Sequence, residues 1–412
     1  MQAASSTKPI GLRLGFLDGM RAIACLYVLL FHVLTVRLDG PAQLSWPLDW
    51  LKAVFGYGHL SVVTFIVLSG FSLMLPVVRS GKLELPAGFR HYISRRARRI
   101  LPPYYASIML ALVPLLAMKS LGAGLGVEQV SHGALSAGSL VSHLLLVHNL
   151  SFDWVYRING PAWSVATEWQ IYFLFPFLLL PLWRRVGPLA TIAISYALGA
   201  LPVFVLAPEH SFFWACPWFA GSFAMGMYGA AIFYSPRAPS AAARFPWWPC
   251  TIGSFAVVCV LTAAGKVESW PYPVVDFAVS VFAFCLAAAA AQYTTRGADT
   301  PRNLLLELVQ SKPLVRISGF SYSLYLIQHP FLRLTEKLVN RLHLPYQTAL
   351  WLHLLAVTPL LIALAWLFAE VFERPFTGGG VLWPWFKERK ERKERLMSLA
   401  PSAAETDRPI LP

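Results

Sequence analysis

Apolar stretches of about twenty residues recur from one end of this 412-residue chain to the other. A helix needs about that length to cross the hydrocarbon core of a bilayer. Because these stretches are continuous and do not alternate with polar residues, they argue against a transmembrane β-barrel. Charged residues make up 13% of the chain, about half the share that soluble domains carry. The sequence therefore predicts an all-α polytopic membrane protein.

Hydropathy, read together with prolines, glycines and charges, predicts about ten transmembrane helices in one bundle. The first is not a signal peptide, because it carries Arg21 and His32 and lacks a small-residue cleavage site. We expect a transmembrane domain over residues 1–380 and a basic cytoplasmic tail over residues 381–412. The predicted spans are approximately 15–36, 59–78, 100–118, 163–183, 188–207, 212–234, 249–265, 272–293, 314–331 and 347–372.

The distribution of Lys and Arg predicts the orientation of the bundle. With both termini in the cytoplasm, about three times as many basic residues fall in cytoplasmic segments as in outside segments. The net charge of +14 then reflects topology and not nucleic-acid binding. One long outside connection contains residues 139–150, which are apolar but too short to span, and we expect them to be re-entrant or interfacial. The alternative, an eleventh span, would place the basic tail outside, against the charge count.

Arg21 and His32 lie eleven positions apart within the first span, in LDGMRAIACLYVLLFH (residues 17–32). Eleven residues make about three helical turns, so both side chains face the same way, about 16 Å apart along the axis. One group is always charged and the other titrates near neutrality, which suggests a polar track through the membrane. The alternatives are an interfacial histidine bonded to a neighbour and an arginine that snorkels to the headgroups, and Asp18 is placed to pair with Arg21.

Glu168 lies near the start of the fourth span, in PAWSVATEWQIYFLFPF (residues 161–177). A carboxylate inside a membrane needs a partner or a water-filled cavity. The predicted topology places Glu168 and His32 at a similar depth in the outer half, where the carboxylate would orient the imidazole and raise its basicity. The alternative is a structural glutamate that a neighbouring helix satisfies.

Polar residues also follow the ninth span, where Ser321, Tyr325 and His329 are spaced i, i+4 and i+8 on one helix face. Such a stripe either holds helices together or lines a cavity. In the second span, LSGFSLM (residues 68–74) offers Ser69, Gly70 and Ser72, for which close helix packing is the expected role.

Four arginines, Arg95, Arg96, Arg98 and Arg99, precede the Pro102-Pro103 start of the third span on the cytoplasmic side. Guanidinium groups bind phosphate with two hydrogen bonds, so a phosphorylated cytoplasmic ligand fits this cluster. Contact with anionic lipid fits the charge equally well. The five cysteines contain no CxxC pair and indicate neither a disulfide framework nor a zinc site.

In their order along the chain these segments resemble the membrane-bound acyltransferase-3 family. The matching segments are LDGMRAIACLYVLLFH, FIVLSGFSLM, RRARRILPPYY, PAWSVATEWQIYFLFP and SYSLYLIQHP. By resemblance, Arg21 and His32 match the family's Arg-x10-His motif, with the histidine as the catalytic residue. Arg96 and Arg99 match its Arg-x-x-Arg motif, implicated in donor binding, and Trp163, Ser164 and Glu168 match the motif that opens the fourth span.

The resemblance implies an O-acyltransferase with ten spans in a cell membrane, the inner membrane if the source is bacterial. It would move an acyl group, expected to be acetyl, from cytoplasmic acyl-CoA to a hydroxyl of a glycan, a lipid-linked sugar or a small metabolite. Some relatives carry an extracellular SGNH-type hydrolase domain that we do not find in this sequence. No metal, permanently bound cofactor or nucleic acid is expected.

Within that expectation, Arg21, Arg96 and Arg99 bind the donor, and His32 acts as base or carries the acyl group. Glu168 orients His32. The expected substrate-lining residues are Trp163, Ser164, Ser321, Tyr325 and His329. The main alternative is a secondary transporter of a small polar solute, although acidic residues within the spans are sparse and no internal repeat is visible. A non-catalytic membrane scaffold would not need the Arg21–His32 stripe.

Overall fold

The computed structural model describes residues 14–36, 38, 44–120, 135–206, 212–265, 272–296 and 302–378. Within these ranges every regular element is a helix and none is a strand. The predicted tail, residues 381–412, lies outside them. Six described segments are long and apolar enough to cross a membrane, so the chain is an all-α polytopic membrane protein, as predicted. These segments are Gly15–Leu34, His59–Arg79, Gly160–Val186, Pro188–Val205, Tyr272–Thr295 and Tyr346–Phe372.

The described residues form a series of helical elements. In chain order they are α1 (Gly15–Leu34), α2 (Leu48–Phe55), α3 (His59–Arg79), α4 (Gly88–Ser120), α6 (Ala137–Leu144), η1 (His148–Leu150), η2 (Gly160–Ala162), α7 (Trp163–Leu174), η3 (Phe175–Leu179), α8 (Leu180–Val186), α9 (Pro188–Val205), η5 (Phe213–Ala215), α10 (Phe219–Tyr234), α11 (Ser240–Arg244), α12 (Trp247–Ala263), α14 (Tyr272–Thr295), α15 (Leu304–Val309), α16 (Lys312–Ser318), α17 (Ser321–Asn340), α18 (Tyr346–Leu352), η6 (His353–Val357), α19 (Thr358–Phe372) and α20 (Arg374–Thr377).

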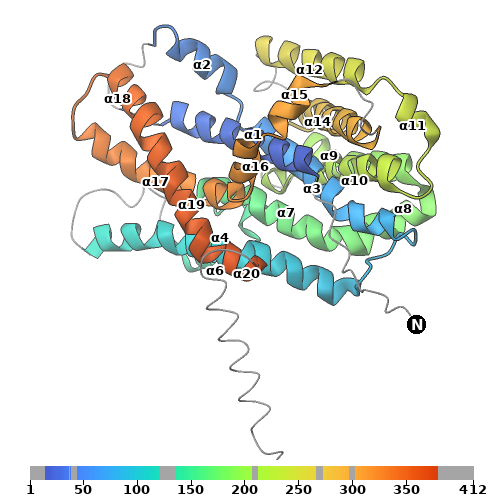
Figure 1. Ribbon diagram of the computed structural model, residues 1–412. Coiled ribbons are helices and arrows are strands. Elements are labelled where there is room, and N and C mark those ends of the chain that lie inside the picture. The colour runs from blue at the N-terminus through green and yellow to red at the C-terminus, as the bar shows by residue number, and fades with distance from the viewer. Residues whose placement is uncertain are drawn as a thin grey trace, which may run out of the picture.

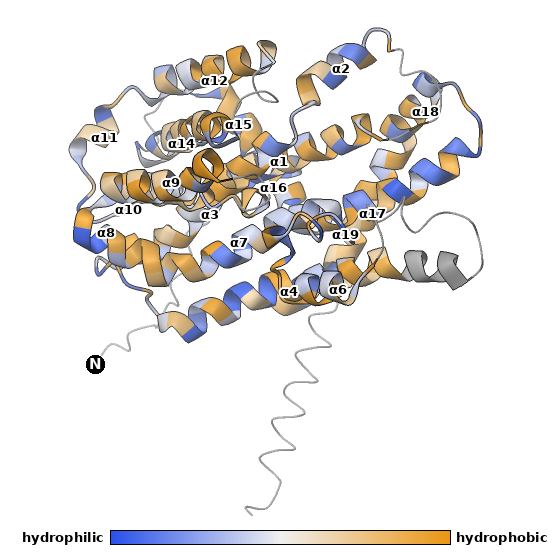
Figure 2. Cartoon of the chain, turned by 180° about the vertical axis from the view of Figure 1, so that it is seen from behind, coloured by the Kyte–Doolittle hydropathy of each residue, from blue (hydrophilic) through white to orange (hydrophobic). Residues whose placement is uncertain are grey.

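The long helices lie side by side in roughly one direction, with α4 along one edge of the bundle and α12 along the opposite edge (Figure 1). Apolar residues dominate most of their length, and polar residues gather toward the ends of the bundle and on α4 (Figure 2). We call the end that carries the arginines of α4 the arginine end, and the opposite end, where α2 lies, the far end.

Glycines let α3 and α10 approach closely at the centre of the bundle. A Cβ atom on Gly70 would lie 2.0 Å from the backbone oxygen of Phe223, and one on Gly226 would lie 1.9 Å from that of Val67. No larger side chain fits at either position, so the two backbones pack directly against each other. The packing role predicted for Gly70 is confirmed.

Two predicted spans do not coincide with helices of the structure. The helix that contains the predicted third span does not begin at Pro102 and Pro103, because α4 starts at Gly88 and continues through both prolines. The packing of α4 against α17, α19 and α20 outweighs the two hydrogen bonds that these prolines remove. The predicted ninth span is divided at Gly319, a poor helix former, into α16 and the longer α17.

The segment predicted to be re-entrant or interfacial does not span the bundle. Its helix α6 has 8 residues, about 12 Å of helix, which is far short of a bilayer. It is anchored to α4, where the Tyr104 hydroxyl donates to the backbone oxygen of His143 at 2.9 Å and Tyr105 donates to that of Leu144 at 2.8 Å. An eleventh span at this position is therefore excluded.

Candidate active site

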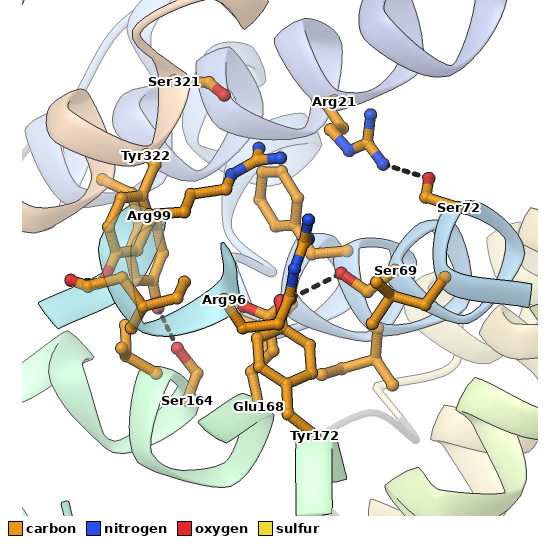
Figure 3. A pocket seen from close by; sticks show the side chains of 17 residues that line it. Arg21, Ser69, Ser72, Arg96, Arg99, Ser164, Glu168, Tyr172, Ser321 and Tyr322 are labelled. Carbon is orange, nitrogen blue, oxygen red and sulfur yellow. Dashed lines mark hydrogen bonds between the residues drawn. The ribbon is translucent and has the colours of Figure 1, made fainter. Parts of the chain in front are cut away.

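Two cavities that share lining residues lie between the arginine end and the middle of the bundle. The inner cavity, of about 90 Å³, lies between α1, α3, α4, α7 and α17 (Figure 3). The arginine mouth, of about 460 Å³, lies at the arginine end. Arg21, Arg96 and Arg99 line both cavities. A continuous set of guanidinium groups therefore runs from the end of the bundle toward its centre.

The inner cavity brings together most of the residues that the sequence marks as candidates for the site. His32, Trp163 and His329 are not among the residues that line it. The candidates that do line it are Arg21, Arg96, Arg99, Ser164, Glu168, Ser321 and Tyr325.

Arg21 points across the bundle and does not snorkel to its end. Its guanidinium donates to the Ser72 hydroxyl and to the backbone oxygen of Leu68 at 3.4 Å. Asp18 lies 3.5 Å away, one turn earlier on α1, which is the pairing considered from the sequence. The prediction that Ser72 serves helix packing alone is therefore wrong, because its hydroxyl accepts the hydrogen bond that holds Arg21 toward the inner cavity.

Glu168 is held by two hydroxyl groups that donate to the same oxygen. The Ser69 hydroxyl donates to Oε1 at 2.5 Å, and the Tyr172 hydroxyl donates to it at 2.6 Å. The other oxygen, Oε2, makes no hydrogen bond to the described residues and is not enclosed, so it faces the inner cavity. Sequence reasoning missed Tyr172, although its i+4 position on the same helix was a usable signal. Ser69, like Ser72, therefore does more than pack between helices, because its hydroxyl binds Glu168.

The structure does not bring Glu168 and His32 together. The Cys25 thiol donates to the backbone oxygen of Ser321 at 3.3 Å, which aligns α1 with the start of α17. His32 lies seven residues beyond Cys25, about 10 Å nearer the far end. On α17, Tyr325 lies one turn beyond Ser321, and its hydroxyl contacts that of Ser164 on α7. Glu168 lies one turn further along α7, which brings it back toward the arginine end. The prediction of equal depth is therefore wrong by about two turns.

A buried turn explains this difference in depth. The Asn159 amide donates to the backbone oxygen of Leu326 at 2.9 Å, and Gly160, Pro161 and Ala162 are all buried. The helix α7 therefore begins inside the bundle and not at its surface. A count of residues from the expected membrane boundary cannot detect that this short 3-10 turn is itself buried.

The same turn closes the inner cavity toward the far end. The hydroxyls of Ser164 and Tyr325 lie 2.7 Å apart, and both lie near the backbone oxygen of Pro161, at 3.1 and 3.0 Å. We call this hydrogen-bonded group of Pro161, Ser164 and Tyr325 the ceiling. His32 lies beyond it. Its ring centroid is 6.1 Å from that of His329, and its Nδ1 makes no hydrogen bond to the described residues.

Trp163 belongs to a separate cluster at the far end. Its ring stacks on that of His59, with centroids 5.7 Å apart and an angle of 17° between the planes. His59 Nε2 lies 2.9 Å from Asp276 Oδ1, and the Trp218 indole donates to Oδ2 at 2.8 Å. Asp276 is fully buried, and these contacts satisfy it. The cluster fastens α3, α14 and the start of α10 to one another.

Glu373, at the arginine mouth, is a further buried carboxyl, and sequence reasoning missed it. The Ser323 hydroxyl donates to its Oε2 at 2.5 Å. Burial raises the pKa of Glu373 above its usual range, while the bond from Ser323 and the nearby charge of Arg99 oppose this shift. Among the described residues no group of three or more His, Cys, Asp or Glu is placed to hold a metal ion.

The sequence of this chain matches a family model and several known proteins. The family model of acyltransferase-3 proteins, described as an acyltransferase domain, matches residues 14–370. The O-acetyltransferase OatA of Staphylococcus aureus is 22% identical over 381 residues, which cover 86% of this chain and 56% of OatA. A putative O-acetyltransferase of S. aureus strain COL is 27% identical over 190 residues, 44% of this chain and 26% of that protein.

The chain spans about half the length of OatA, or 56%. No solved structure matches it. The family match covers nearly every residue discussed above, from the start of α1 to Glu370 in the last turn of α19. The chain therefore belongs to the acyltransferase-3 family.

Proposed function

We propose that the chain is an integral-membrane O-acyltransferase that moves an acyl group, in the first place acetyl, from cytoplasmic acyl-CoA to a hydroxyl on the other side of the membrane. The observation that carries this proposal is the route formed by the arginine mouth and the inner cavity, which share Arg21, Arg96 and Arg99. In this proposal the arginine end faces the cytoplasm, as the excess of basic residues there favours. The O-acetyltransferase relatives support acetyl as the group transferred.

The two cavities suit the two parts of an acyl-CoA molecule. The arginine mouth, at about 460 Å³, has the room and the positive charge for the phosphates and the nucleotide. The inner cavity, at about 90 Å³, admits only a thin chain such as the pantetheine arm. The free Oε2 of Glu168 would accept a hydrogen bond from an amide N–H of that arm, in place of the orientation of His32 expected from the sequence.

In this proposal the reaction takes place at His32, beyond the ceiling. When the hydrogen bond between Ser164 and Tyr325 opens, the thioester passes between these residues toward His32. His32 then takes the proton of the acceptor hydroxyl as its oxygen attacks the thioester carbon. The C–S bond breaks, and the thiolate of CoA receives the proton from His32. A glycan, a lipid-linked sugar or a small metabolite would supply the hydroxyl.

The test uses the purified protein in nanodiscs, with radiolabelled acetyl-CoA and a crude extract of surface glycans and lipids. We expect the wild type to release CoA and add an acetyl mass to an acceptor, and His32→Ala to lose this activity by at least about 100-fold, the range for a general base. His91→Ala, at an exposed position on α4 that lines neither cavity, is the matched control. Acid quenching that traps labelled protein in the wild type alone would indicate an acyl-histidine intermediate. Solute uptake without CoA release would support the transporter instead.

A further inference from the structure

Gln328 is a buried amide without a partner. It lies on α17, and none of its side chain is exposed. Neither its Nε2 nor its Oε1 makes a hydrogen bond to the residues that the structure describes. A primary amide removed from water without partners destabilises the folded state. A side chain of this kind is therefore kept for something other than the stability of the fold.

Buried Gln292 and half-buried Gln170 show what a structural role looks like for a glutamine in this bundle. Gln292, which is 4% exposed, donates from Nε2 to the backbone oxygens of Ala243 at 2.9 Å and Phe245 at 2.8 Å. Gln170 donates to the backbone oxygen of Leu146 at 3.1 Å. Among the described glutamines and asparagines, Gln328 is the one for which both polar atoms are buried and lack a partner.

The position of Gln328 indicates what its amide would bind. Its side chain lies beside the His32 imidazole, yet without the geometry of a hydrogen bond to it. His32 Nδ1 is also buried without a partner. Tyr325, part of the ceiling, lies one turn earlier on α17. A group that passes the ceiling from the inner cavity therefore arrives between His32 and Gln328.

We propose that the Nε2–H of Gln328 binds the carbonyl oxygen of the acyl group and stabilises the negative charge that forms there, an inference that rests on the proposed function. Attack by the acceptor oxygen forms a C–O bond, moves the hydroxyl proton to His32 and leaves the former carbonyl oxygen as an oxyanion. That oxyanion accepts the hydrogen bond from Gln328. As it returns to a carbonyl, the C–S bond breaks, and His32 protonates the departing thiolate.

The experiment replaces Gln328 by an apolar residue of similar size. With acetyl-CoA and the glycan and lipid extract, Gln328→Leu should lower the rate at saturating acetyl-CoA by about 100-fold or more, as loss of an oxyanion donor does. The acetyl-CoA concentration for half-maximal rate should change less than about threefold. Because the substitution removes an unpaired buried amide, the melting temperature in nanodiscs should rise or stay the same. If Gln328 had only a structural role, Gln328→Leu would lower the melting temperature and leave the rate per folded molecule unchanged.

Gln292→Leu is the matched control, and it should melt at a lower temperature while each folded molecule retains the wild-type rate. If Gln328→Leu keeps more than about a third of the wild-type rate while His32→Ala loses it, Gln328 is not the oxyanion donor although the proposed function stands. A fall in melting temperature with an unchanged rate per folded molecule would likewise overturn the assignment. If the wild type shows no His32-dependent release of CoA, the proposed function fails and this inference fails with it.

Discussion

Tyr172→Phe tests the arrangement around Glu168 because it removes one oxygen atom and leaves the ring in place. The Tyr172 hydroxyl donates to Glu168 Oε1 at 2.6 Å, beside the Ser69 hydroxyl at 2.5 Å. A hydrogen bond to a charged group contributes about 1.5–3 kcal/mol. Because Ser69 still holds the same oxygen, we expect a loss near the lower end, about 2 kcal/mol. If that loss falls on the bound state, it corresponds to about thirtyfold in donor affinity.

The assay is CoA release as a function of acetyl-CoA concentration, with the variant and the wild type in nanodiscs. The half-saturating concentration should rise by about tenfold to thirtyfold, while the maximal rate changes less, because Glu168 contacts the arm of the donor and not the reacting carbon. Tyr92→Phe is the control, since the Tyr92 hydroxyl donates only to the backbone oxygen of Tyr172 at 3.1 Å and Tyr92 does not line the inner cavity. Equal half-saturating concentrations for the two variants would refute the assigned role of Glu168.

Two further predictions concern the ends of the bundle. Glu373→Gln removes a negative charge from the arginine mouth and should lower the half-saturating concentration of acetyl-CoA by about threefold to tenfold, as like charges about 10 Å apart imply. Burial raises the pKa of Glu373, so the wild-type carboxyl becomes neutral as the pH falls through this raised pKa. Donor affinity should therefore rise toward acid pH in the wild type and not in Glu373→Gln. A rise in both proteins would contradict the role assigned to Glu373. Asp276→Ala leaves His59 and the Trp218 indole without their buried partner. It should lower the free energy of unfolding by about 3 kcal/mol without changing the rate per folded molecule. An unchanged melting temperature would show that the far-end cluster does not hold its helices together.

The parts of the site that follow from helical periodicity are those that the sequence predicts well. Asp18 and Arg21 are three residues apart on one helix and do lie together. Ser321 and Tyr325, four residues apart, both line the inner cavity. Local geometry determines such contacts, so the sequence contains the information needed to find them.

The contacts between helices could not be predicted in the same way. In an apolar bundle many rotations of a helix bury similar surface, and hydropathy does not choose between them. Nothing in the spacing of Ser69 and Ser72 indicates that one binds Glu168 and the other Arg21. Glu373 reaches the arginine mouth from the end of α19, far in sequence from the arginines that line it. The depth of Glu168 depends on the buried 3-10 turn η2, which hydropathy places at the surface of the membrane.

The buried polar atoms of the bundle divide into two kinds, and their positions bear on which side the acceptor enters. Asp276 and Oε1 of Glu168 have their hydrogen bonds, so they hold helices or position a side chain. An unpaired polar group inside a membrane costs several kcal/mol. Among the described residues such groups occur at several places, including Arg96 Nε at the arginine end. His32 and Gln328 are the two that lie together beyond the ceiling. A region that keeps donors and acceptors unpaired is suited to a hydroxylated molecule, which favours entry of the acceptor from the far end.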